Sequence, residues 1–132
     1  MISKILWFLR CTWYYDYRWQ KLAGDVASDF GASVSIGLFL DANLLSLNLI
    51  LKYYANIPLL FFKFGNLVGA ISVVSVALLT HFFLASGGRF KLIIKEFENE
   101  PRNKKSWHII MTIAYMIFSF IVCGYLLAVV KI

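Results

Sequence analysis

Long apolar runs alternate with short polar segments along this chain. The runs cover about residues 32–54, 67–86 and 108–130. Each is close to the ~20 residues that an α-helix needs to cross the hydrocarbon core of a bilayer. Polar and charged residues gather before the first run and between the second and the third. The pattern predicts an all-α membrane protein with three transmembrane helices.

The composition favours the same class. Hydrophobic residues make up 61% of the 132 residues and charged residues only 15%, whereas soluble domains average about 45–50% apolar and about 25% charged. A soluble chain of this size has too much surface for its volume to bury the excess. We therefore expect one transmembrane domain at residues 32–132, preceded by an N-terminal segment at 1–31.

The N-terminal segment is rich in aromatic and basic residues. Its charges make it unsuited to cross a bilayer, although a short fourth span is the alternative. Aromatic and basic side chains together are typical of amphipathic helices that lie in the membrane interface, and we expect such a helix here. The side chains expected to anchor this helix, or to gate a pore beside it, are Trp7, Arg10, Trp13 and Arg18.

The loop at 87–107 is expected to contain a second amphipathic helix. Gly87 and Gly88 predict a break after the second run, and Pro101 is expected to end the loop helix. Between these points, four apolar residues recur at the spacing of one helix face. They are Phe90, Ile93, Ile94 and Phe97.

Charge predicts the orientation, because loops rich in Lys and Arg stay on the cytoplasmic side of a membrane. The loop at 87–107 and the N-terminal segment hold most of the basic residues. We expect both in the cytoplasm, with the C-terminus on the outer side of the membrane. Between the first two runs, Pro58 predicts a break at Ile57.

The basic residues of the loop have two interpretations. They can set topology and attract anionic lipid, at ~1 kcal/mol for each residue near the surface. They can instead bind an anionic ligand, a nucleotide or an oligonucleotide, through its phosphates. The candidate ligand-binding residues are Arg89, Lys91, Lys95, Arg102, Lys104 and Lys105.

Polar residues interrupt the first apolar run and fall mostly on one side of the predicted helix. Ser33, Gly37, Asp41 and Asn48 share a stripe about 100° wide. A charge near the middle of a bilayer costs at least ~2.5–3.5 kcal/mol, so it normally faces water or a partner. In a homo-oligomer, for instance a tetramer, the stripe would line a pore in which the carboxylates favour cations. The alternative is that these side chains form hydrogen bonds between packed helices.

The other two runs carry weaker signals. Gly65 and Gly69 form a G-x-x-x-G pattern, which allows close packing of helices. The third run has four small or polar residues on one side, which predict a packing face or a second pore wall. They are Thr112, Tyr115, Ser119 and Cys123. Nothing in the sequence matches a metal-ligand, cofactor or catalytic motif, and we expect neither a cofactor nor an enzyme.

The chain resembles the small membrane effectors of bacterial anti-phage systems. The resemblance rests on the aromatic stretch at 7–19, the polar first run and the basic loop. It implies a homo-oligomeric ion channel in the inner membrane of a bacterial cell, which an anionic nucleotide or oligonucleotide opens. A partner enzyme would make this signal, and the resulting depolarisation would arrest growth. The alternatives are an accessory or assembly subunit of a larger membrane complex and a non-selective permeabilising toxin.

Overall fold

The computed structural model describes residues 1–24, 26–56 and 66–130, which are helical apart from short turns and a few residues at helix ends. The break expected at Ile57 and Pro58 and the first glycine of the G-x-x-x-G pattern, Gly65, lie outside them. Four long helices dominate: α1 (Ile2–Leu22), α2 (Ser28–Ala55), α4 (Asn66–Leu84) and α6 (Arg102–Val129). A 3-10 turn, η1 (Ser86–Gly88), and a short helix, α5 (Arg89–Glu98), connect α4 to α6.

Three stretches are long and apolar enough to cross a membrane, as the sequence predicts. They are Ser28–Ala55, Leu67–Glu98 and Arg102–Val129. The second stretch takes in η1 and α5, although the left-handed backbone of Gly87 (φ 64°) and Gly88 (φ 80°) breaks the helix where the sequence predicts a break. The helices of the first and third stretches, α2 and α6, begin before the apolar runs and include polar residues at their N-terminal ends.

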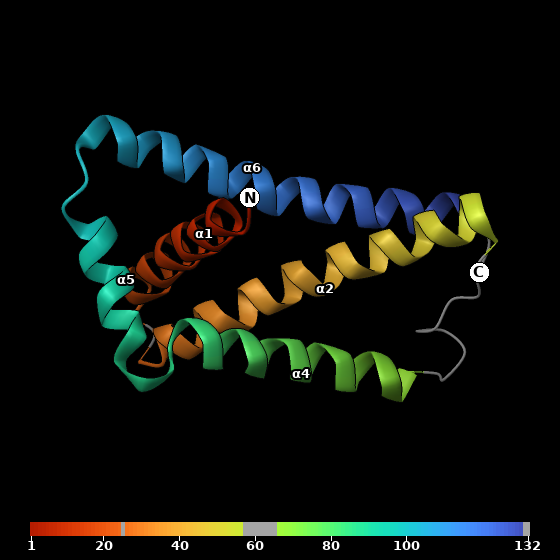
Figure 1. Ribbon diagram of the computed structural model, residues 1–132, viewed down its shortest axis with the longest axis horizontal. Coiled ribbons are helices and arrows are strands. Elements are labelled where there is room, and N and C mark those ends of the chain that lie inside the picture. The colour runs from red at the N-terminus through yellow and green to blue at the C-terminus, as the bar shows by residue number, and fades with distance from the viewer. Residues whose placement is uncertain (25, 57–65, 131–132) are drawn as a thin grey trace.

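The central helix of the bundle is α2. It lies between α4 and α6, and it crosses from one to the other along its length (Figure 1). Near its start, Gly37 lies against the backbone of Ala77 in α4. Near its end, Leu49 is fully buried and packs with Leu126 and Val130, at the end of α6. Contacts of α2 between Gly37 and Leu49 thus hold the three candidate spans together.

The middle of α1 is buried on every side, which differs from the one-sided helix expected from the sequence. Residues 11–16 are all buried because α2, α5 and α6 each pack on a different side of the helix. Trp13 contacts α2, Tyr14 stacks on Phe97 of α5, and Phe8 packs edge-on against Tyr115 of α6. The N-terminus of α1 thus lies beside the middle of α6 (Figure 1).

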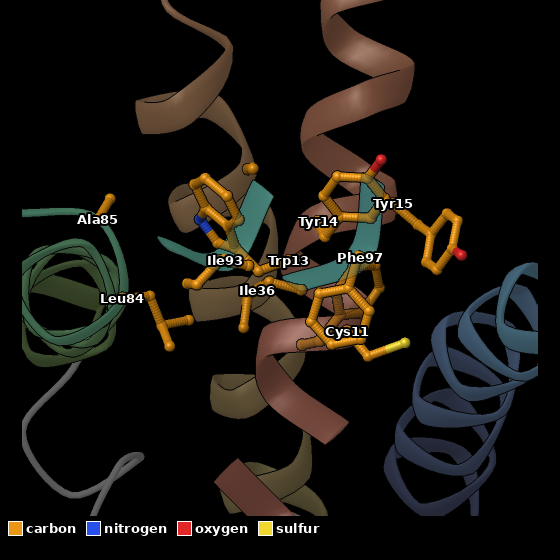
Figure 2. Packing of buried hydrophobic residues seen from close by; sticks show 11 residues of the cluster. Cys11, Trp13, Tyr14, Tyr15, Ile36, Leu84, Ala85, Ile93 and Phe97 are labelled. Atoms are coloured by element: carbon orange, nitrogen blue, oxygen red, sulfur yellow. The ribbon is translucent and has the colours of Figure 1, made fainter. Parts of the chain in front are cut away.

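The amphipathic spacing in the loop forms a helix, α5, whose apolar face closes over α1. Ile93 and Phe97 are buried in the same cluster as Cys11, Trp13 and Tyr14 (Figure 2). Pro101 follows this helix and is the N-cap residue of α6. Because α1, α5 and the first turns of α6 meet here, we call this region the α5 end of the bundle.

The contact between Gly37 and Ala77 makes a test of the α2–α4 packing. A Cβ at residue 37 would lie 2.7 Å from the Cα of Ala77. We expect Gly37→Ala to lower the free energy of unfolding in micelles by about 1–3 kcal/mol, the usual effect of overpacking. Gly69→Ala is the matched control, since nothing lies within 4 Å of its added Cβ. Equal stability of the two variants would show that α2 and α4 do not pack this closely.

Candidate functional site

The polar stripe predicted on α2 faces the neighbouring helices of the same chain at its first three positions. Ser33 is fully buried and accepts a 3.0 Å hydrogen bond from Nε1 of Trp13 in α1. Its Oγ also lies 3.2 Å from Nδ1 of His81 in α4. One turn later, Gly37 makes the close contact with Ala77. This part of the stripe therefore joins α2 to α1 and α4.

The charged member of the stripe also has a partner on α4. The carboxylate of Asp41 accepts a 2.8 Å hydrogen bond from Ser72. To the side of the stripe, Asn43 donates a 2.6 Å hydrogen bond to the hydroxyl of Tyr115 in α6. Asp41 and Asn48 are both partly exposed. These contacts favour the alternative that the polar residues hold helices together, and pore lining, which needs several copies of the chain, stays a prediction.

The four residues predicted to share one side of the third span form the packing face of α6. Thr112, Ser119 and Cys123 are buried, and Tyr115 lies between Phe8 of α1 and Asn43 of α2. Thr112 has no hydrogen-bond partner for its buried hydroxyl among the described residues. The side of α6 that bears these residues therefore faces the interior of the bundle and packs against α1 and α2.

A buried polar cluster at the α5 end joins α1 to α6. Nδ1 of His108 lies 2.8 Å from the carboxylate of Glu100, and the hydroxyl of Tyr15 donates to the same oxygen at 3.4 Å. Burial, followed by the charge of Glu100, raises the pKa of Tyr15, so the hydroxyl keeps its proton and acts as a donor. The ring of Trp7 packs edge-on against His108. Sequence spacing gave no sign of this cluster, because its members come from α1, the turn after α5, and α6.

The residues predicted as gate or anchor lie on different sides of α1. Trp7 packs between Phe97 and His108, and Trp13 is fully buried. Arg10 pairs with Glu96 of α5 at 3.4 Å. Arg18 is exposed. The two tryptophans therefore belong to the packed core of the bundle, whereas Arg10 is partly exposed and Arg18 is exposed.

The six basic residues predicted to bind a ligand do not converge on one point. Arg89 donates to the backbone oxygen of Phe83, and the ammonium group of Lys91 lies over the ring of Phe90. Lys105 donates to the backbone oxygen of Glu98 at 2.6 Å. Lys95, Arg102 and Lys104 are exposed.

Lys105 does meet two basic residues of α1 around a pocket of about 390 Å³. We call it the basic pocket. Its lining comprises Tyr14, Tyr17, Arg18, Lys21, Leu22, Ile94, Glu98 and Lys105. Three cationic side chains thus face one carboxylate, beside two phenol rings. Burial raises the pKa of Tyr14, although Arg18 beside it acts in the opposite direction.

Sequence reasoning named Arg18 and Lys105 as functional residues but assigned them different roles, and it missed Tyr14, Tyr17 and Lys21 as part of a site. A usable signal was present, since the N-terminal segment and the loop were both predicted on the same side of the membrane. The sequence did not show that α1 docks against α5, and this docking brings the two basic segments together.

Among residues 1–24, 26–56 and 66–130, no group of three His, Cys, Asp or Glu side chains is placed to hold a metal ion. Comparison of the chain with protein-family models, with curated proteins and with solved structures gives no match.

The burial of Cys11 provides a test of the docking of α1. Burial, and then the negative charges of Glu100 and Glu96, raise the pKa of its thiol to about 12. Only the thiolate reacts with maleimides, and a raised pKa leaves less thiolate at any given pH. In a Cys123→Ser protein at pH 8, we expect N-ethylmaleimide to label Cys11 more than about a hundredfold more slowly than a free cysteine, whose pKa is about 8.5.

The control is a Lys4→Cys variant that lacks both native cysteines, because residue 4 is exposed on the same helix. Equally fast labelling at the two positions would show that α1 is not docked in the bundle.

Proposed function

We propose that this chain is a multi-span membrane protein that binds a phosphate-bearing anion, such as a nucleotide, in the basic pocket. The observation that carries the proposal is the meeting of Arg18, Lys21 and Lys105, from two distant segments, around one pocket. The positive-inside rule would put this pocket in the cytoplasm. A soluble cytoplasmic ligand could then reach it directly.

The lining offers the groups that a nucleotide needs. The guanidinium of Arg18 can donate two parallel hydrogen bonds to a phosphate, and the two lysines add point charges. Glu98 is an acceptor for the amino or hydroxyl groups of a nucleotide, whereas the ring of Tyr17 already stacks on Trp13 and lies under the ammonium group of Lys21. A volume of about 390 Å³ lies within the ~300–1,000 Å³ typical of ligand pockets.

Ligand binding here would act on α1. Arg18 and Lys21 lie near the end of this helix, and Lys105 lies on α6. An anion held between them would favour the docked position of α1 against α6. A ligand shifts a conformational equilibrium by its difference in affinity for the two states, so the pocket would report on and stabilise the docked state. This behaviour fits the signal-receiving role that the resemblance to anti-phage effectors implies.

The proposal predicts nucleotide binding that depends on the pocket cations. We expect a fluorescent ATP analogue to bind the protein in nanodiscs of zwitterionic lipid. Arg18→Gln or Lys21→Gln should weaken binding about tenfold or more, because a hydrogen bond to a charged group is worth ~1.5–3 kcal/mol. The matched controls are Arg102→Gln and Lys104→Gln, which remove the same charges outside the pocket.

An equal loss of affinity in the pocket variants and in the controls would show that binding depends only on net charge. This result would contradict the proposed site. Absence of saturable binding, tested with ATP, a dinucleotide and inorganic pyrophosphate, would contradict the proposed function.

A cation pore formed by several copies is the second candidate function. The observation that favours it is that Asp41 stays partly exposed after accepting its hydrogen bond from Ser72, and that Asn48 is partly exposed farther along α2. A carboxylate at this depth is usually placed near water or a partner. In such an assembly, the partly exposed side of Asp41 would face the axis.

The pore predicts that the charge of Asp41, and not its hydrogen bond, controls conduction. We expect Asp41→Asn to lower potassium flux into liposomes severalfold and Ser72→Ala to leave it nearly unchanged, since Ser72→Ala keeps the carboxylate. The two variants separate charge from hydrogen bond, because Asp41→Asn keeps an amide oxygen that can accept from Ser72, whereas Ser72→Ala removes the donor. Liposomes without flux would argue for a non-conducting subunit, which would then co-purify with another chain. Equal flux in all three proteins would argue for non-selective permeabilisation and would contradict a pore lined by Asp41.

A further inference from the structure

A second hollow lies on another side of α1, and no function has been assigned to it above. It consists of two adjoining clefts with volumes of about 250 and 460 Å³. They adjoin each other, since they share the side chains of Leu6, Phe83 and Leu84, and we call the two clefts together the groove. The groove runs between α1, α2 and α4 and ends beside α5.

The inner cleft is suited to hydrocarbon. Apart from Thr80, its lining is aliphatic or aromatic, and it includes Leu9, Ile36 and Val76. The hydroxyl of Thr80 donates to the backbone oxygen of Val76 at 2.7 Å, so it does not need a polar ligand. From Val76 to Leu84 the helix rises about 12 Å. This is close to half of the ~30 Å hydrocarbon core, which is the depth of one lipid leaflet.

The outer cleft is suited to an anion. Arg10 and Arg89 line it together with a single carboxylate, Glu96. The ion pair of Arg10 with Glu96 is long, at 3.4 Å, and both side chains are more than a third exposed, so it leaves Arg10 available to another anion. In addition, the buried Nε of Arg10 has no hydrogen-bond partner among the described residues. Arg89 lies just after the turn at which the chain leaves α4.

We propose that this groove is a binding site for an anionic phospholipid. One acyl chain lies in the inner cleft against Leu9, Ile36 and Val76. The headgroup phosphate binds Arg10 and Arg89 at the outer cleft, level with the end of α4. Because α1 supplies Leu6, Leu9 and Arg10, the site exists only when α1 is docked, and the lipid stabilises that state. The site shares no side chain with the basic pocket and does not depend on the function proposed for it.

The first test compares two lipids on the full-length protein in detergent by native mass spectrometry. Dioleoyl phosphatidylglycerol should bind at one per chain, with an affinity at least about fivefold above that of dioleoyl phosphatidylcholine, the ratio expected from one basic residue near an anionic surface. Arg89→Gln should reduce this preference to less than about twofold, and Arg10→Gln should act in the same direction. Arg102→Gln, at an exposed arginine outside the groove, should leave it unchanged. Equal binding of the two lipids, or an unchanged preference in Arg89→Gln, would overturn the proposal.

The second test fills the inner cleft. Val76→Phe should lower the affinity for both lipids at least about fivefold, whereas Val74→Phe, on the exposed side of the same helix, should not. Circular dichroism and tryptophan fluorescence establish that each variant is folded before it is used. If Val76→Phe folds and binds phosphatidylglycerol as tightly as the unaltered protein, the acyl chain does not occupy the cleft and the proposal fails.

Discussion

The docking of α1 into the space between α2, α5 and α6 is the contact on which the rest of the structure depends. It buries Trp13 and Tyr15 almost completely and places Phe97 of α5 over them. Large aromatic side chains contribute most to such a core, because each buries about 150–250 Å². Without this helix, the apolar face of α5 would lose the surface that it covers. The basic pocket would lose five of its eight lining residues, and the groove would lose Leu6, Leu9 and Arg10.

The two sites lie on different sides of α1 and use different parts of this helix. The basic pocket uses Arg18 and Lys21 near the C-terminal end of the helix, and the groove uses Leu6 and Arg10 near its N-terminal end. The cluster of Glu100, His108 and Tyr15 lies between them and fixes the helix to the start of α6. Two ligands that both require the docked helix would assist each other's binding, since each reduces the conformational cost that the other meets.

The sequence predicted the three spans, the loop helix, the break at Gly87 and Gly88, and the buried side of α6, because each is a local pattern that one helix carries by itself. The burial of α1 was not predictable in this way. Its charges and rings are typical of an interfacial helix, and a helix that is enclosed on several sides needs partners that are distant in the chain. The same limit applies to the sites: Arg10 and Glu96 are 86 residues apart. Periodicity likewise placed Ser33, Gly37 and Asp41 on one side of a helix, but it does not identify the surface that this side meets.

The long separation between α1 and its partners has a consequence for how the protein is made. Synthesis produces α1 before α6, yet Tyr15 and Phe8 of α1 pack against rings of α6. Until α6 has been made, α1 needs an environment that accommodates exposed aromatic rings beside charged groups. The headgroup layer of a bilayer is such an environment. The amphipathic composition of α1 therefore suits the interface in which the nascent helix would lie, whereas its buried rings suit the core in which it is enclosed after folding.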